Sequence, residues 1–264
     1  MSVVIPSLRA AVAVPGWAKN ELWRRARTVP SLDLRFADNK SLVDATTGQS
    51  LVTFTRASTG PFVGSDGLIQ SAATDAPRFD HDPTTGESLG LLVEEPRTNL
   101  LLQSQDFSTT WTNVGSSENV NVVVAPNGTS TADALVDTAI SETHNFTQTL
   151  SALSGSTTYT FSCFMKKGSK NYGVFVFAPV SSWGIGTGAS VFFDLNNGTV
   201  GTAANATGTI QALPNEWHRC TATATTTVTP GTVIMRIGPS LTGTAQTYTG
   251  TGDEAIYLWG AQLE

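Results

Sequence analysis

The chain has 264 residues, 40% of them hydrophobic and 14% charged, so it has enough apolar material for a core and no composition typical of disorder. Its 39 threonines, 24 glycines and 12 prolines favour strands and turns, which predicts an all-β fold. The net charge of −6 combines +4 over residues 1–30 with −10 over the rest. Because a nucleic-acid surface needs clustered Lys and Arg, this acidic body predicts no nucleic-acid partner.

The first 16 residues, MSVVIPSLRAAVAVPG, are largely apolar but are interrupted by Pro6 and Arg9. No charged leader precedes them, so they do not have the pattern of a signal peptide. No run along the chain approaches the roughly 20 apolar residues that a membrane-spanning helix needs. We therefore expect no membrane insertion.

Residues 17–27, WAKNELWRRAR, predict a short amphipathic helix. Trp17 and Trp23 belong to its apolar side, beside Arg24, Arg25 and Arg27. Because two tryptophans are costly to leave exposed, we expect residues 1–30 to anchor the chain on an acidic surface of another protein. The alternative is a flexible tail with a solvated basic face.

Residues 31–98 contain short alternating apolar runs separated by turn sequences, which predicts a small region built from β-hairpins. The runs are SLDLRFA, SLVTFTRA and GLIQSAA, the last of them after a GSDG turn. A further run, GLLVEEPRTNLLL, predicts one long strand with Pro96 at an edge or a bend. Each run is too short to bury a core alone, so it must pack on a neighbour, either the following domain or another copy of the chain. Residues 31–98 are therefore expected to be a connector region or a region where copies of the chain meet.

Residues 99–264 contain nine candidate strands, which predict a jelly-roll β-sandwich. They are NVNVVVA, HNFTQTL, TTYTFSCFMKK, YGVFVFAPV, ASVFFDL, TGTIQAL, WHRCTATATTTV, TVIMRIGP and AIYLWGAQLE. The segment TADALVD is instead expected to form a helical turn. Cys163 and Cys220 lie in two of the strands and either form a disulfide or remain free and buried.

Two segments carry a resemblance to known families. RTNLLLQSQDFSTTWTN (97–113) and AIYLWGAQLE (255–264) resemble the opening and closing strands of carbohydrate-binding jelly-roll modules. The stretch from LDLRFADNKSLVDATTGQ to EEPRTNLL, about residues 32–107, resembles a block of tailed-phage fibre and head-spike proteins that precedes such a jelly roll. The resemblance implies a virion surface protein, often a homotrimer, on the head or the tail.

The resemblance to carbohydrate-binding modules also implies a structural calcium ion between the first and last strands. Asp106 matches the acidic opening position, whereas the closing strand offers Gln262 in the region where the family has an aspartate. Two interpretations of Asp106 stay open, a calcium ligand and a plain turn residue. No other cofactor is expected.

Such modules hold sugar rings against aromatic side chains, which makes Trp183, Trp111 and Tyr172 the candidate glycan-binding residues. Trp183 lies in the Gly-rich segment SSWGIGTG, where an exposed ring would suit a ligand. The alternative is a hydrophobic side chain that anchors its own loop. Trp217 alternates into a strand and is assigned to the core.

No catalytic motif is found, so the chain is not expected to be an enzyme. It has no GxSxG elbow, its three histidines are far apart, and GIGTG precedes a strand rather than the helix that a phosphate loop needs. The expected function is a structural virion subunit that attaches to a host-surface glycan. The alternatives are a ligand-free decoration or connector protein and a glycan-degrading enzyme, whose carboxylates would come from Glu94, Glu95, Asp194 and Glu216.

Overall fold

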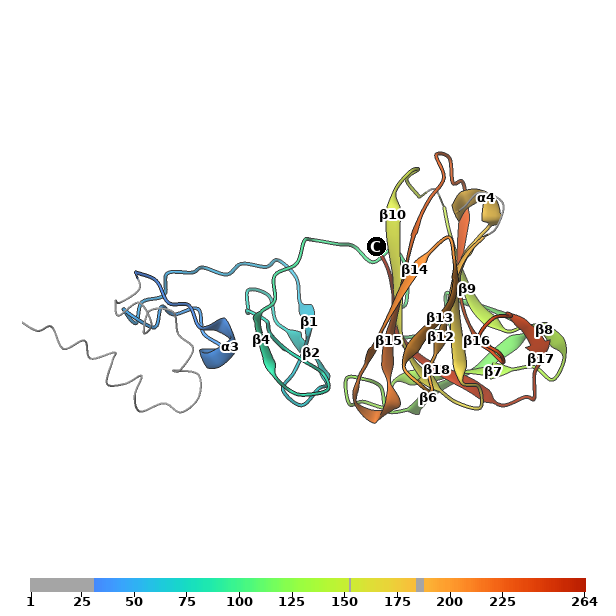
Figure 1. Ribbon diagram of the computed structural model, residues 1–264, viewed down its shortest axis with the longest axis horizontal. Coiled ribbons are helices and arrows are strands. Elements are labelled where there is room, and N and C mark those ends of the chain that lie inside the picture. Colours follow the sequence, from blue (N-terminus) through green and yellow to red (C-terminus); the bar gives the residue numbers. More distant parts are fainter. Residues whose placement is uncertain (1–30, 152, 184–187) are drawn as a thin grey trace, which may run out of the picture. The chain divides into compact units, whose positions relative to one another are not determined.

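The structure is a computed structural model that describes residues 31–151, 153–183 and 188–264 (Figure 1). The chain divides into two compact units, the first ending at Val93 and the second made of residues 94–264 together with residues 66–69 and 83–85. No helix among the described residues is long and apolar enough to cross a membrane. The proposed docking residues lie outside the described residues: Trp17, Trp23, Arg24, Arg25 and Arg27.

Two small antiparallel hairpins form the first unit, as the turn-rich sequence predicts. Strand β1 (Gly60–Val63) pairs with β2 (Ile69–Ala72), and β3 (Phe79–His81) pairs with β4 (Ser88–Leu91). The GSDG turn joins β1 to β2, and Gly67 has the positive φ of +76° that glycine tolerates. The carboxylate of Asp80 accepts a hydrogen bond from the Val63 N–H at 2.7 Å, which ties the two hairpins together.

Three of the strands predicted in this region are wrong. SLDLRFA runs into the one-turn helix α3 (Phe36–Asn39), and residues 51–56 belong to no strand. The Asp44 carboxylate accepts hydrogen bonds from the hydroxyls of Thr46 and Thr47 and thus bends the chain between the two runs. GLLVEEPRTNLLL is not one strand, because β4 ends at Leu91 and Pro96 has no N–H to continue a ladder.

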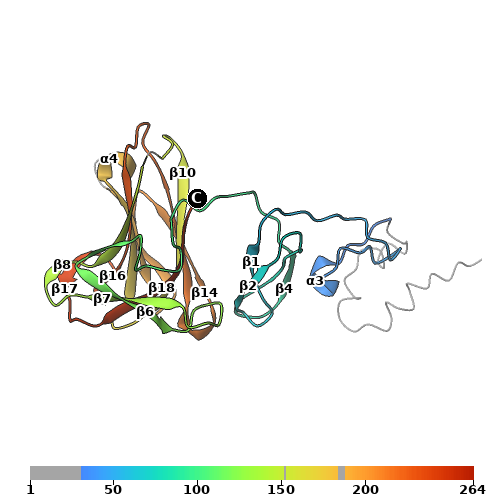
Figure 2. The ribbon, with the colours of Figure 1, turned by 180° about the vertical axis from the view of Figure 1, so that it is seen from behind.

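The second unit is a sandwich of two six-stranded antiparallel sheets packed face to face (Figures 1 and 2). In one, called here the β16 sheet, the order is β13 (Thr199–Ala204), β12 (Ala189–Asp194), β11 (Tyr172–Ala178), β16 (Val233–Ser240), β9 (Asn145–Leu150) and β5 (Thr112–Val114). In the other, the β10 sheet, it is β14 (Thr207–Ala212), β15 (His218–Thr225), β10 (Thr158–Lys167), β18 (Glu254–Leu263), β7 (Ala132–Asp137) and β6 (Ser116–Val123). The sandwich confirms the predicted all-β fold.

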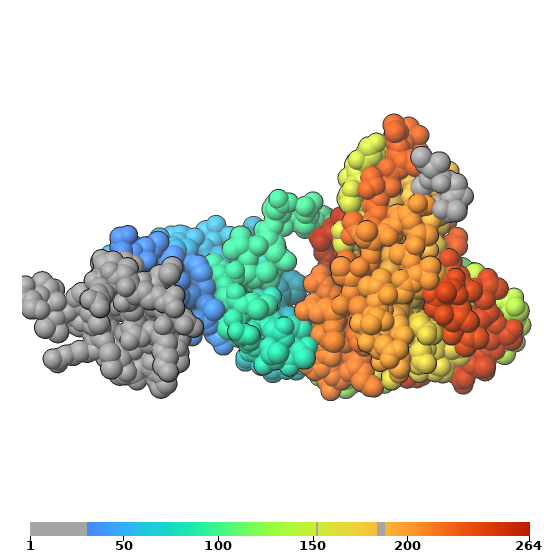
Figure 3. All heavy atoms as spheres, in the orientation of Figure 1, coloured from blue at the N-terminus to red at the C-terminus, as the bar shows by residue number. Residues whose placement is uncertain are grey.

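Smaller elements complete the second unit. Strands β8 (Ser141–Thr143) and β17 (Thr247–Thr249) form a separate pair, and helix α4 (Val180–Trp183) and the 3₁₀ helix η2 (Pro214–Glu216) are single turns. The exposed strands β13 and β14 connect an edge of one sheet to an edge of the other, and their residues, in orange, form part of the surface seen in Figure 3.

All nine strands predicted for the sandwich are present. TADALVD is not helical but forms strand β7, whose neighbours β6 and β18 satisfy its backbone on both sides. Strand β18 lies in the middle of the β10 sheet, between β10 and β7. The Asn99 side chain holds its end, donating to the Ala261 carbonyl oxygen at 3.1 Å and accepting from the Leu263 N–H at 2.9 Å.

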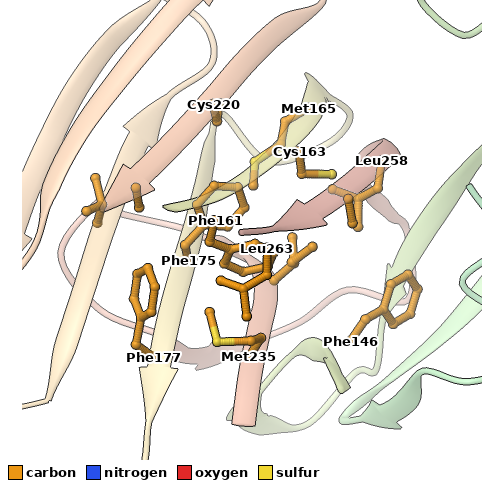
Figure 4. Close-up of a cluster of buried hydrophobic side chains, with 14 of the residues drawn as sticks. Phe146, Phe161, Cys163, Met165, Phe175, Phe177, Cys220, Met235, Leu258 and Leu263 are labelled. Carbon is orange, nitrogen blue, oxygen red and sulfur yellow. The ribbon is translucent and has the colours of Figure 1, made fainter. Parts of the chain in front are cut away.

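The core lies between the two sheets and is built from alternate residues of their strands (Figure 4). Phe161 of β10 stacks on Phe175 of β11 with ring centroids 4.3 Å apart. Cys163 and Cys220 are opposite each other across β10 and β15, fully buried and not disulfide-bonded. Burial raises the pKa of the Cys163 thiol to about 12.

Candidate functional site

Trp183, the first-choice glycan residue, is part of the core. Only 1% of it is exposed, and its ring lies 4.9 Å from that of Phe177 and 6.0 Å from that of Tyr159. The single turn of α4 places the side chain against the sandwich, so the expectation of an exposed ring is wrong. The alternative interpretation, a hydrophobic anchor for its own loop, fits this burial.

The other two candidate rings do not join Trp183 in one aromatic surface. Trp111 is 5% exposed, packs 5.0 Å from Phe107 and donates its indole N–H to the Gln103 carbonyl oxygen. Tyr172 is partly exposed at the start of β11, and Gly243 approaches its ring so closely that a Cβ there would lie 2.8 Å from it.

Asp106 is a turn residue. Its carboxylate accepts hydrogen bonds from the Ser108 hydroxyl at 2.6 Å and the Ser108 N–H at 2.9 Å, and these bonds lower the pKa of Asp106. Gln262 donates to the Glu264 carboxylate at 3.0 Å. Among the described residues no three His, Cys, Asp or Glu side chains are grouped to hold a metal ion. The geometry favours the turn interpretation of Asp106.

The carboxylates considered for glycan cleavage have other contacts. Asp194 accepts hydrogen bonds from the N–H groups of Asn196 and Asn197 in the turn after β12. Glu216 lies 3.8 Å from Lys166 and 3.6 Å from Lys167. Glu95 forms an exposed ion pair with Arg97 at 2.8 Å.

A buried ionic cluster of Asp137, Lys170 and Tyr248 holds one part of the sandwich together. Asp137 accepts the N–H groups of residues 251–253, the Tyr248 hydroxyl at 2.9 Å and the Lys170 ammonium at 3.1 Å. Burial alone would raise the pKa of Asp137, but these hydrogen bonds lower it to about 2. With every partner satisfied inside the cluster, its role is structural.

A groove of about 550 Å³ lies beside strands β5 and β9 at the edge of the β16 sheet. Its lining combines hydroxyl groups, leucine side chains and one amide. The lining residues are Leu100, Leu102, Thr110, Thr112, Gln148, Thr149, Leu150, Ser151 and Leu153. Gln148 fixes its wall, accepting from the Leu102 N–H at 2.7 Å and donating to the Leu102 carbonyl oxygen at 3.0 Å. Such a mixture of hydroxyl and aliphatic groups suits a ligand that has both polar and apolar sides.

Two residues that line the groove, Thr112 and Thr149, belong to the outer face of the β16 sheet, the face that points away from the core, whereas Leu150 packs against the core. Met235 and Ile237 are fully buried in the core, so the alternate residue Arg236 points outward. Arg236 lies directly opposite Thr147 of β9 and Val176 of β11. Thr147 in turn lies opposite Thr112, a residue of the groove. We call the groove and the outward-pointing residues of β9, β16 and β11 the β16 face.

Two side chains on the β16 face have no hydrogen-bond partner for a buried polar atom. They are Asn145, whose Oδ1 is unpartnered in a residue only 6% exposed, and Arg236, whose Nε is unpartnered. Phe146 beside Asn145 is in the core, so Asn145 also points outward, and a Cβ on Gly238 would lie 3.1 Å from its Cβ. Unsatisfied buried polar atoms are rare and costly, so each one calls for an explanation.

The sequence alone did not single out these two residues. Both stand in correctly predicted strands: Arg236 is an isolated charged residue in the apolar run TVIMRIGP, whereas Asn145 is one of several polar residues in HNFTQTL. The alternation shows that both point away from the core, but only the sheet order places them on neighbouring strands.

Comparison with known proteins gives similarity of structure alone. No family model and no curated protein matches the sequence. The tailspike protein 4 enzymatically active domain of bacteriophage CBA120 aligns with 62% of this chain and 21% of its own length, at 12% identity and a TM-score of 0.37. The carbohydrate-binding module TmCBM61, solved with β-1,4-galactotriose, aligns over 64% of this chain and 99% of its own, at 11% identity and a TM-score of 0.38.

A third similar structure holds the CBM22-1 and GH10 modules of Clostridium thermocellum xylanase 10B with xylohexaose. It aligns with 63% of this chain and 28% of its own, at 14% identity and a TM-score of 0.37. This chain therefore spans about a fifth of the tailspike domain and just over a quarter of the xylanase modules. At these identities and TM-scores no activity or ligand is transferred from any of the three.

Proposed function

We propose that the chain is a non-enzymatic structural subunit of a tailed-phage particle, a fibre or head spike at the virion surface, whose sandwich binds a host-surface glycan. The particle assignment rests on the resemblance of residues 32–107 to the fibre and head-spike block. The glycan assignment rests on the β16 face. A fibre or spike holds its C-terminal domain out toward the cell, which is where a sugar-binding face is useful.

The observation that carries the glycan assignment is the groove of hydroxyl groups and leucines, together with the unpartnered amide oxygen of Asn145, which lies diagonally to the groove residue Thr112 across β5 and β9. A sugar offers hydroxyl groups that donate and accept hydrogen bonds, together with C–H faces that pack on aliphatic side chains. A ligand hydroxyl would supply the donor that the buried Asn145 Oδ1 does not have. The leucines of the groove would contact the apolar side of the same ring.

The proposal assigns the remaining segments as the sequence predicts them. Residues 1–30 dock on other virion proteins and residues 31–98 organise a homotrimer, so that three weak sugar sites act together through a high local concentration. Light scattering after gel filtration is expected to give three times the chain mass. A mass of one chain at micromolar concentration would remove the trimer from the proposal.

The decisive experiment on the particle is electron cryo-microscopy of virions that carry the full chain or a chain without residues 1–30. We expect density on the head or tail that disappears with the deletion. A chain absent from both particles would contradict the structural assignment and make a secreted binder or an enzyme the better proposal.

The decisive experiment on the sandwich is glycan-array binding by the full chain and by the variant Asn145→Ala. We expect the variant to lose binding by about tenfold while its unfolding free energy stays equal or rises, because it removes an unsatisfied buried atom. Asn119→Ala is the matched control, since Asn119 lies in the β10 sheet, where its amide donates to Glu254 at 3.0 Å. Equal binding by both variants and the parent would contradict a sugar site at Asn145.

A second candidate function is a ligand-free decoration or connector protein, favoured by the burial of Trp183. It predicts that the chain appears on the particle but binds no glycan on the array. The two experiments together therefore separate the two functions.

A further inference from the structure

We infer that the glycan held on the β16 face is an acidic sugar, and that Arg236 binds its carboxylate. This inference rests on the proposed function and adds the ligand class to it. It begins from the position of Arg236, which stands inside a six-stranded sheet rather than at its edge, with β11 on one side and β9 on the other.

Arg236 has no counter-charge among its neighbouring positions in the sheet. The positions directly around it are Thr147, Val176, Ile234 and Gly238, and the diagonal positions are Asn145, Thr149, Val174 and Ala178. None of these eight residues is charged. Arg236 forms no hydrogen bond and no ion pair with any described residue, and its Nε is buried without a partner.

A guanidinium without an ion-pair partner among uncharged neighbours favours the binding of an anion. The β11 positions beside Arg236 are apolar, with Val176 directly opposite and Val174, which is 3% exposed, on the diagonal. Apolar surroundings lower the local polarity, and lower polarity strengthens an ionic contact. A guanidinium is a planar fork of N–H donors that matches the two oxygens of a carboxylate. A neutral sugar hydroxyl would leave most of these donors unpaired.

Asn145 lies diagonally to Arg236 and supplies the complementary contact. Its Oδ1 accepts a hydrogen bond, whereas the guanidinium only donates. A sugar that carries a carboxylate beside a hydroxyl satisfies both groups at once. The groove at Thr112 and Thr149 then takes the neighbouring residue of the oligosaccharide.

The test is an array of acidic bacterial oligosaccharides, each printed beside its methyl ester, which has the same sugar but no negative charge. The full chain is compared with Arg236→Gln, Arg236→Lys and the control Arg219→Gln, whose Arg lies over Phe164 on the β10 sheet. We expect the parent to prefer the free acids by at least about tenfold, the strength typical of a charge-assisted hydrogen bond. Arg236→Gln should abolish that preference, Arg236→Lys should retain part of it, and Arg219→Gln should leave it unchanged.

Binding of acids and esters with equal strength would overturn the acidic-sugar inference and leave the glycan proposal standing, with Arg236 serving only to cover the valines. A preference for acids that survives in Arg236→Gln would overturn the assignment to Arg236. No binding to any sugar on the array would remove the proposed sugar-binding function, and the inference with it. Thermal unfolding of each variant checks that all of them are folded.

Discussion

Replacing Asp137 by asparagine tests whether the buried ionic cluster holds the sandwich together. The change removes the negative charge that lies 3.1 Å from the Lys170 ammonium. The Lys170 side chain is only 6% exposed. Loss of one partner from a buried pair leaves the other charge uncompensated, and such changes cost roughly 3–5 kcal/mol of unfolding free energy. Since whole domains are stable by only about 5–15 kcal/mol, urea denaturation should detect the loss easily.

The pH dependence of the same variant gives an independent check. The pKa of Asp137 falls from an ordinary value of 3.8 to about 2 in the folded protein, which corresponds to about 2 kcal/mol. Because the folded-state pKa is the lower one, this stabilisation is complete above pH 3.8 and is lost as the pH falls toward 2. The parent should therefore lose about 2 kcal/mol of its stability advantage over Asp137→Asn within that window.

Lys170→Met is the matched control. It leaves Asp137 with the three N–H donors of residues 251–253 and the Tyr248 hydroxyl, so we expect a cost of only about 1–2 kcal/mol. A loss below about 1 kcal/mol for Asp137→Asn, or a parent-minus-variant difference that stays constant from pH 5 to pH 2, would refute the reasoning.

Three further predictions concern packing within the sandwich. Trp183→Ala should lower the unfolding free energy by about 3–5 kcal/mol, as measured by denaturation, whereas an exposed ring would cost almost nothing. Cys163 and Cys220 should not react with a thiol reagent at pH 8 until the protein is unfolded, and reaction of the native protein would contradict their burial. Gly155→Ala should lower the melting temperature, because the added Cβ would lie 1.9 Å from the Val228 carbonyl oxygen. Gly201→Ala should lower it less, because there the nearest atom to the added Cβ, the Phe192 carbonyl oxygen, is 3.3 Å away.

The strands of the sandwich could be predicted from sequence because alternation is a local signal. In TVIMRIGP the core residues Met235 and Ile237 alternate with outward residues, and the segment forms β16 as expected. TADALVD shows the limit of such signals. Its alanines and leucine favour a helix locally, but strands β6 and β18 on either side impose an extended backbone.

The candidate site was much less accessible from sequence. Trp183 was expected to be exposed because it stands beside glycines, but the direction of its ring depends on contact with Phe177 and with Tyr159 of β10, a strand far from it in the sequence. Arg236 looks like an ordinary solvated residue in an otherwise apolar strand. Its isolation becomes visible only when the sheet order brings uncharged residues of β9 and β11 to both sides.

The central place of β18 also sets the order in which the sandwich can assemble. β10 and β7 are separated in the sheet by residues 254–263, so both present an open edge until that late segment arrives. Open edges expose unpaired N–H and C=O groups that attract other extended chains. Pairings between segments so distant in sequence form slowly. Until β18 pairs with β10 and β7, the folding chain can misassemble with other chains through these open edges.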